Sequence, residues 1–278
     1  MIIVTGASGV IGRALMVRLR AERLPCTALD RNMLARSVPL ADAVMRKPSV
    51  LVHLAAVVPQ PPAIPDDEAS AAHTLYMDAR LLEAVKHWDC HAIYASGCSL
   101  YSRGDAAPKR EEEAGSEQRP SSPYLAAKQY GERSFLASGR ATVLRISAPV
   151  GEGLSRATVI GRFMEAAKTG GDLEVWGGGL REQNYVDVAD LADALFRTLI
   201  VRPGELINIA ADQPITMLEL ARQAIQICGS GVLRMSGKPD PRDSETARYS
   251  NHKAADLLGW RPMTPMRISL ERLSRVAL

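Results

Sequence analysis

The feature that most constrains the fold is a glycine-rich turn close to the N-terminus. Gly6, Gly9 and Gly12 are spaced three residues apart and directly follow a short β-branched run, Ile2–Val4. Apolar residues at helical spacing continue over 13–22. A β-branched run of this length is typical of a buried strand, and the later spacing is typical of a helix. The N-terminus is therefore predicted to form a strand, a tight turn and a helix.

A turn of this kind suits a pyrophosphate. Glycines let the backbone turn sharply and approach the ligand closely, while the helix N-terminus offers unpaired N–H groups and the positive end of its dipole. Besides the three glycines, we expect Ser8, Val10 and Ile11 to contact a dinucleotide. The spacing is G-x-x-G-x-x-G rather than G-x-G-x-x-G, and the alternative is a strand–turn–helix unit that binds nothing.

The end of the next predicted strand bears on the choice of dinucleotide. The strand covers Cys26–Leu29 and ends at Asp30, eighteen positions after Gly12. A carboxylate there can bind both hydroxyls of the adenosine ribose and repels a 2′-phosphate, which favours NAD over NADP. Arg31 follows at once, and an arginine can pair with a 2′-phosphate. NADP therefore stays open as the second choice.

Strand and helix patterns alternate along the first half of the chain. Such alternation predicts an α/β fold, a doubly wound parallel sheet with helices on both faces. Residues 59–70 and 103–119 lack apolar periodicity and are predicted to be loops, the second of them a solvated surface loop that can include a helical turn. The further strands are expected at 50–56, 92–95 and 141–146, and the helices at 75–88 and 124–136.

The pattern changes after Gly151. A predicted helix at 159–168 is followed by a short strand at 173–176, a run of three glycines and another helix at 218–227. We expect residues 1–150 to form the dinucleotide-binding core and 151–278 to form mainly a smaller, interleaved substrate-binding region. Within it, residues 181–210 are expected to return to the core sheet.

Composition excludes several classes of function. The net charge is only +3, from 34 basic and 31 acidic side chains, and no basic stripe for a nucleic acid is present. The four cysteines are scattered without metal-ligand spacing, which predicts no metal site and a reducing compartment. Apolar runs are too short for a membrane span, and glycine follows the first residues too soon for a signal peptide. A cytoplasmic protein is expected.

The motifs together resemble a known family. Thr5–Gly12 with the Y-x-x-x-K segment Tyr124–Lys128 resembles the extended short-chain dehydrogenase/reductase family, in its NAD-dependent epimerase/dehydratase branch. Val52–Ala56, Tyr185–Ala192 and Leu258–Pro262 resemble further family segments in the same order. The resemblance implies a Rossmann fold, bound NAD, a nucleotide-sugar substrate and a homodimer that pairs through the helices at 75–88 and 124–136.

Tyr124 and Lys128 lie four residues apart and hence on one face of a helix. A free phenol has a pKa of ~10, so it is a poor base at neutral pH. A nearby ammonium and the positive charge of an oxidised nicotinamide would lower that pKa. By resemblance, Tyr124 is the catalytic base and Lys128 also binds the nicotinamide ribose. Alone, such a pair is more often part of an ordinary surface helix.

The resemblance also implies the remaining contacts with the cofactor. Leu54, Ala55 and Ala56 would line its adenosine side, and Ile146 and Ser147 would lie beside its nicotinamide.

The catalytic hydroxyl is ambiguous, because an ungapped match places Gly97 where the family has serine or threonine. Ser96 after a one-residue shift, or Ser99, could take the role, and Ser96 is preferred. By the same resemblance, Arg181 would bind the substrate diphosphate. An equally favoured alternative is that Arg181 is simply a solvated side chain in a loop.

Three functions therefore stay open. The first is an oxidoreductase or epimerase of nucleotide-activated sugars. The second is a reductase or dehydrogenase of another small carbonyl compound, because Thr74 and Ala148 replace asparagines that are frequent in the family. The third is a non-catalytic NAD-binding protein, suggested by Gly97. A dehydratase is less favoured, because that branch of the family usually has Asp-Glu after its catalytic threonine, where this chain has Cys98 and Ser99.

Overall fold

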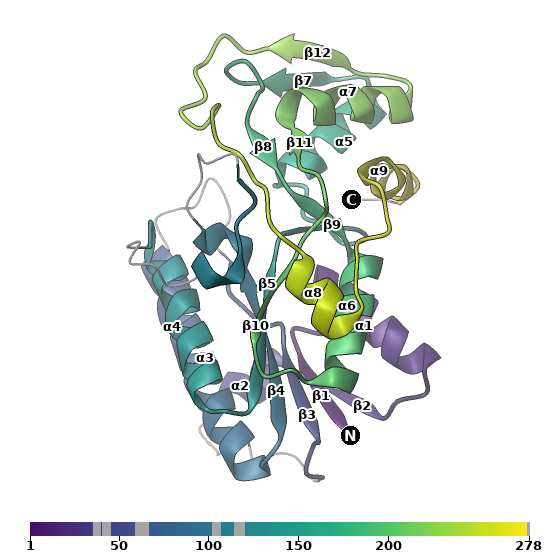
Figure 1. The fold of residues 1–278 in the computed structure, drawn as a ribbon. Coiled ribbons are helices and arrows are strands. Elements are labelled where there is room, and N and C mark those ends of the chain that lie inside the picture. Colours follow the sequence, from purple (N-terminus) through teal and green to yellow (C-terminus); the bar gives the residue numbers. More distant parts are fainter. Residues whose placement is uncertain (36–39, 41–45, 59–66, 102–106, 114–119, 277–278) are drawn as a thin grey trace.

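The computed structural model describes residues 1–35, 40, 46–58, 67–101, 107–113 and 120–276. Its core is a six-stranded sheet with the strand order β10-β5-β4-β3-β1-β2, in which every neighbouring pair is parallel (Figure 1). The predicted α/β class and the doubly wound parallel sheet are therefore confirmed. The strands are β1 (Ile2–Thr5), β2 (Cys26–Leu29), β3 (Val50–His53), β4 (His91–Gly97), β5 (Ala141–Ile146) and β10 (Leu206–Ile209).

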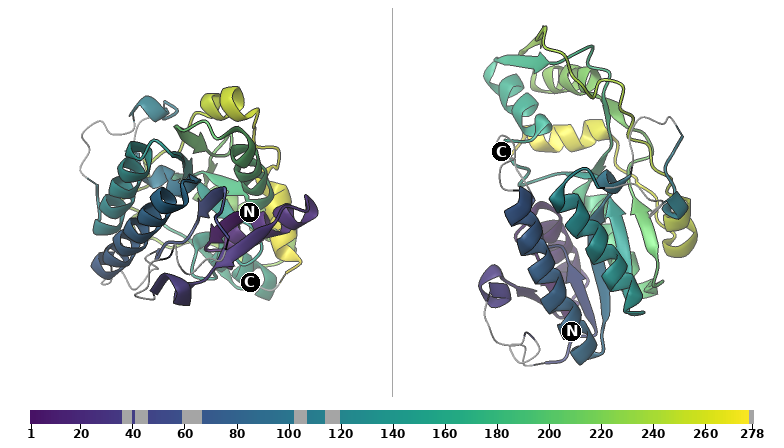
Figure 2. Two further views of the ribbon diagram at one scale, coloured as in Figure 1. Left: turned by 90° about the horizontal axis from the view of Figure 1, so that it is seen from below. Right: turned by 90° about the vertical axis from the view of Figure 1, so that its left-hand side faces the viewer.

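Helices cover both faces of this sheet. On one face, α1 packs against α6, and α6 against α8; on the other, α3 and α4 lie side by side (Figure 2). Alternate strand residues supply the two cores, since successive side chains of a strand point to opposite faces. Val4 packs in the α1/α6 core and Ile3 in the α3/α4 core. The helices are α1 (Val10–Ala21), α3 (Asp67–Trp88), α4 (Pro123–Ala137), α6 (Val188–Val201) and α8 (His252–Leu258).

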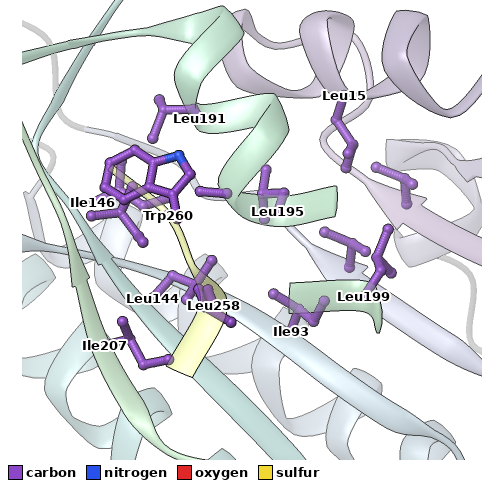
Figure 3. Close-up of a cluster of buried hydrophobic side chains, with 14 of the residues drawn as sticks. Leu15, Ile93, Leu144, Ile146, Leu191, Leu195, Leu199, Ile207, Leu258 and Trp260 are labelled. Carbon is purple, nitrogen blue, oxygen red and sulfur yellow. The ribbon is translucent and has the colours of Figure 1, made fainter. Parts of the chain in front are cut away.

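The α1/α6 core is sealed by the segment after α8. Trp260 is 1% exposed and lies close to Leu191 and Ile146 (Figure 3). Its indole N–H donates to the Asp190 carbonyl oxygen at 3.0 Å. Residues far apart in the sequence thus share one core.

The order of the strands places a ligand site. From β1 the chain passes through α1 to β2 on one side, whereas the later strands are added on the other side, starting with β3. In open α/β sheets, ligands bind outside the carboxyl ends of the strands where the order reverses. The glycine turn after β1 and residues 54–56 after β3 both lie at this point.

A smaller lobe lies beyond the carboxyl ends of the sheet strands (Figure 1). Its helices share one apolar cluster. They are α5 (Val159–Thr169), α7 (Met217–Cys228) and α9 (Met266–Ser274). Three strand pairs accompany them: β7 (Asp172–Val175) with β12 (Val232–Met235), β8 (Glu182–Gln183) with β11 (Ile215–Thr216), and β6 (Ala148–Val150) with β9 (Tyr185–Asp187).

Two predicted loops are partly structured. Residues 67–70 belong to α3, whose first turn carries Asp67 and Glu68 where acidic groups complement the helix dipole. In the second loop, Lys109 and Glu111 are buried rather than solvated, because Glu111 accepts the backbone N–H of Asn208 on the edge strand β10 at 2.7 Å. Residues 59–66, 102–106 and 114–119 lie outside the described residues.

The strand expected over 50–56 ends at His53. A short helix, α2 (Arg31–Ala35), follows β2. No helix in the described part of the chain is both long and apolar enough to cross a bilayer.

Candidate active site

The glycine turn forms a cradle of bare backbone. Gly6 has a φ of +68°, and a Cβ there would lie 2.7 Å from the Ala55 nitrogen. A Cβ at Gly12 would lie 2.1 Å from the Gly6 carbonyl oxygen. Gly9 occupies the N-cap of α1, so no side chain covers the unpaired N–H groups of the first turn, and no acidic residue is present there. These features fit a pyrophosphate.

The other predicted contacts lie around this cradle. Ser8 is exposed, while Val10 and Ile11 open α1 and are half-buried. Residues 54–56 follow β3 and are also half-buried. The Ala55 N–H donates to the Thr5 Oγ1 at 3.2 Å, which ties the end of β3 to the end of β1.

Asp30 has a structural task that the sequence did not suggest. Its Oδ1 accepts the backbone N–H of Met33 at 2.8 Å, which caps the short helix α2. The carboxylate is exposed at the end of β2. Its second oxygen has no hydrogen bond to described residues. Arg31 opens α2, but its side chain lies outside what the structure describes.

Helix α4 brings the tyrosine–lysine pair to the end of β4. Ser122 caps the helix by accepting the Leu125 N–H at 3.3 Å, and Pro123 occupies its first turn. Tyr124 follows in that turn. One turn later the Lys128 ammonium donates to the Ala95 carbonyl oxygen at 2.7 Å and lies 3.9 Å from the centre of the Tyr94 ring.

The charges around this pair differ from the expected arrangement. Burial, followed by the carboxylates of Asp78 and Asp67, raises the pKa of Tyr124 to about 12. Burial lowers the pKa of Lys128 to about 8, against the opposing effects of Asp78 and Glu132. Lowering of the phenol pKa by Lys128 and an oxidised nicotinamide together stays a prediction. Tyr124 therefore keeps its proton at neutral pH until further positive charge is supplied.

The two candidate hydroxyls occupy different environments. Ser96 lies on β4, is 7% exposed, and its Oγ has no hydrogen-bond partner among the described residues. Ser99 lies in the 3₁₀ turn Cys98–Leu100 and is exposed. Buried hydroxyls normally bond to protein or to ordered water, so Ser96 has the capacity to bind a ligand or a water. Ser147, just after Ile146 at the end of β5, has the same unpartnered, buried hydroxyl.

Arg181 lies in the smaller lobe, just before β8. Its Nε is 3.5 Å from a carboxylate oxygen of Asp240, so its positive charge is already partly balanced. Asp243 accepts the N–H groups of Gly178 and Leu180 at 2.8 Å and holds the triple-glycine turn beside it. The role of Arg181 stays a prediction. Among the described residues, no group of three or more histidines, cysteines or acids could hold a metal ion.

Residues 2–210 match the sequence profile described as the NAD dependent epimerase/dehydratase family. The chain belongs to this family. It is thus an enzyme of the NAD-dependent epimerase/dehydratase type, in a family whose members act on nucleotide sugars. The cradle at the switch point, the uncapped helix and the unpartnered Ser147 hydroxyl suit the dinucleotide that the family name requires.

Several relatives are similar over nearly their whole length. UDP-glucose 4-epimerase of Mycolicibacterium smegmatis is 26% identical over 95% of this chain and 94% of its own. The structure of MoeE5 in complex with UDP-glucuronic acid and NAD has a TM-score of 0.82 and 25% identity, covering 97% of this chain and 96% of that one. The structure of RMD from Pseudomonas aeruginosa complexed with NADPH has a TM-score of 0.82 and 25% identity. The match covers 98% of this chain and 97% of that one.

A buried ion pair that no motif in the sequence indicates ties helix α4 to the sheet. The Arg145 guanidinium on β5 donates through Nε and one terminal nitrogen to both oxygens of Glu132 on α4, at 2.8 and 2.7 Å. Both side chains are nearly inaccessible. The two residues lie thirteen positions apart in different elements, so no local pattern in the sequence signals the contact.

We predict that Glu132→Gln lowers the free energy of unfolding by about 3–5 kcal/mol, because it leaves the Arg145 charge buried without its partner. Urea denaturation followed by circular dichroism measures this loss. The matched control is Asp89→Asn, which breaks the exposed ion pair with Arg140 and should cost below about 1 kcal/mol. Equal losses in both variants would contradict the anchoring role.

Proposed function

We propose that this enzyme uses NAD to oxidise and reduce a carbon of a nucleotide-activated sugar, as an epimerase or a related oxidoreductase. The observation that carries the proposal is the arrangement at the end of β4. Tyr124 and Lys128 on α4 lie beside a strand that carries the buried, unpartnered hydroxyl of Ser96. The nucleotide sugars named for the relatives support the substrate class.

The residues of the chain divide the work of binding. The glycine turn and the first N–H groups of α1 hold the pyrophosphate, and Leu54 with its two following alanines lines the adenosine side. Lys128 binds the nicotinamide ribose from its position on the Ala95 carbonyl. Ile146 and Ser147 lie beside the nicotinamide, where the unpartnered hydroxyl of Ser147 can bind it. When bound, the oxidised nicotinamide supplies the hydride acceptor and a positive charge beside the phenol.

Proton transfer falls to Tyr124. Its pKa of about 12 is set by burial and by Asp78 and Asp67, so it needs added positive charge before it can accept a proton. With that charge present, Tyr124 first releases its own proton to solvent. As the phenolate it then removes the proton from the sugar hydroxyl, and it returns that proton when the carbonyl is reduced. The Ser96 hydroxyl donates a hydrogen bond to the same sugar oxygen and orients it.

Residues 151–278 supply the substrate side in this proposal, with Arg181 on the diphosphate. One observation favours the second candidate, a reductase or dehydrogenase of another small carbonyl compound. Arg181 already pairs with Asp240, and Asp243 lies on the adjacent turn. These carboxylates reduce the attraction of this face for a polyanion.

The proposal is tested with a panel of UDP-, dTDP- and GDP-sugars. Product isomers are separated by chromatography, and NADH is followed by absorbance. An epimerase interconverts sugars without net change of NADH, whereas a reductase consumes it. We expect Tyr124→Phe to lower kcat by about 10²–10⁴-fold, the usual contribution of a general base. Tyr130→Phe, which changes an exposed tyrosine of the same helix, is the control.

The serine assignment is checked in the same assay. Ser96→Ala should slow turnover by at least about tenfold, as expected when one hydrogen bond to the reacting oxygen is lost, and Ser99→Ala should leave it near the native rate. Near-native turnover by Tyr124→Phe would refute the mechanism. Turnover of simple ketones alone would favour the second candidate, and bound NAD without any turnover would indicate a non-catalytic protein.

We further propose that NAD is preferred over NADP because of the Asp30 carboxylate. Asp30→Asn can still cap α2 through its amide oxygen, so the variant removes charge and keeps shape. The ratio of the Kd for NADPH to that for NADH should fall by about fivefold, the effect of one unit charge at about 4 Å in water. Fluorescence titration measures both constants. Asp256→Asn on α8, an exposed acid, should leave the ratio unchanged.

A homodimer is proposed through α3 and α4, which lie side by side on one face (Figure 2). Leu75, Tyr76 and Tyr130 on these helices are 38%, 51% and 65% exposed. Sedimentation equilibrium should give about twice the chain mass of 30.1 kDa. Tyr130→Asp should weaken association by at least about tenfold, or 1.4 kcal/mol. Met263→Asp, far from these helices in the sequence, should leave it intact; a native monomer would refute the proposal.

A further inference from the structure

A chain of buried hydrogen bonds connects Thr5, just before the glycine turn, with Tyr94, whose ring lies under Lys128. The Thr5 Oγ1 lies 2.8 Å from the His53 Nδ1, and the His53 Nε2 lies 2.8 Å from one oxygen of Asp78. The Tyr94 hydroxyl donates to the other Asp78 oxygen at 2.7 Å. All four residues are at most 4% exposed. The chain joins β1, β3, α3 and β4 at the level of the proposed active site.

One assignment of donors and acceptors satisfies every member. The Thr5 oxygen accepts the Ala55 N–H and donates its own proton to the Nδ1 of a neutral His53. His53 then carries its proton on Nε2 and donates it to Asp78. Every group is satisfied when His53 is neutral and Asp78 is ionised.

The pKa values agree with this assignment. Burial lowers the pKa of His53 in spite of Asp78. Burial acts to raise the pKa of Asp78, but hydrogen bonding and charge from His53, together with Lys128 and Tyr94, hold it below its ordinary value. His53 is therefore neutral and Asp78 ionised at neutral pH.

Helix α4 packs directly against these buried hydrogen bonds because residue 131 is a glycine. A Cβ at Gly131 would lie 2.2 Å from the Tyr94 hydroxyl oxygen and 2.4 Å from an Asp78 oxygen. Glycine inside a helix costs about 0.5–1 kcal/mol relative to alanine, yet here it allows α4 to contact the Tyr94–Asp78 bond. Lys128 lies three residues earlier, with its ammonium over the ring of the same tyrosine.

We propose that Asp78 is a positioning residue whose carboxylate holds Lys128 in its ammonium form on the Ala95 carbonyl and the Tyr94 ring. The ammonium is then ready to bind the ribose of the cofactor. The catalytic part of this inference rests on the proposed function, whereas the effect on Lys128 is a property of the protein alone. No pattern in the sequence singles out Asp78 for this role.

Four elements bring titratable groups close to Lys128. Glu132 on α4 is the other carboxylate that acts on it, but both of its oxygens bind Arg145 from β5. His53 from β3 and Tyr94 from β4 are neutral. Among the described residues, Asp78 from α3 is thus the carboxylate near Lys128 whose hydrogen bonds come from neutral donors.

The direction of the effect follows from the sign of the charge. Burial lowers the pKa of Lys128 to about 8, and Asp78 acts to raise it. Removing the negative charge of Asp78 therefore lowers this pKa further. At neutral pH a larger fraction of Lys128 would then be an uncharged amine, which loses both a donor proton and its charge.

The test measures Lys128 itself by NMR of protein labelled with ¹³C at the lysine Cε. The chain has seven lysines, and Lys128→Arg assigns the resonance. We expect native Lys128 to titrate near pH 8 and Asp78→Asn to lower its midpoint by about one pH unit or more. The asparagine of this variant can accept a hydrogen bond from His53 and donate one to Tyr94, so both buried hydrogen bonds are kept.

Two control variants separate charge from packing. Tyr94→Phe removes a hydrogen bond but keeps the ring under Lys128 and the carboxylate of Asp78, so the midpoint should stay close to native. Glu83→Gln removes an exposed carboxylate of the same helix and should change nothing. A folded Asp78→Asn protein with an unshifted Lys128, or an equal shift in Tyr94→Phe, would overturn the inference.

Two further measurements keep the test decisive. In the native protein, ¹³Cγ labelling of aspartate must show Asp78 ionised at neutral pH, and ¹⁵N labelling must show the His53 proton on Nε2. A protonated Asp78 or a proton on Nδ1 would overturn the inference even if Asp78→Asn fails to fold. In turnover, the alkaline limb of the kcat profile should move to lower pH with the Lys128 midpoint. A shifted lysine without native turnover would reject the proposed function and leave the positioning role intact.

Discussion

The close approach of two backbone segments at Gly6 is the constraint on which the rest of the site depends. A Cβ at this position would lie 2.7 Å from the Ala55 nitrogen, so no side chain can be accommodated without separating the ends of β1 and β3. With glycine there, the Thr5 hydroxyl reaches both the Ala55 N–H and His53. The same contact therefore opens the cradle for a pyrophosphate and begins the buried chain that leads to Lys128.

Several charged side chains are buried in the half of the molecule that carries the glycine turn. Arg145 and Glu132 neutralise each other in a bidentate pair, whereas Asp78 accepts its hydrogen bonds from neutral donors. Burying charge is costly unless it is compensated. The result is an ammonium of lowered pKa and a phenol of raised pKa on one helix, a pair whose protonation responds to any charge that a ligand brings.

The smaller lobe is stabilised by different contacts from those of the sheet. Its strand pairs are short, its core is separate, and many of its charged side chains pair with one another, as Arg181 does with Asp240. The parallel sheet fixes the half that carries the glycine turn through long-range backbone pairing. The smaller lobe relies instead on three helices that pack around its own apolar cluster.

The sequence by itself determined what depends on local spacing. The strand–turn–helix at Gly6–Gly12, the α/β alternation and the placement of Tyr124 and Lys128 on one helix all follow from periodicity within a few turns. Only the tertiary structure decided which hydroxyl is buried, because Ser96 and Ser99 differ in depth rather than in pattern. It also decided that Asp78 meets His53 and Tyr94, and that Asp240 meets Arg181. Those contacts join residues 16 to 59 positions apart, and only packing of the elements brings such side chains together.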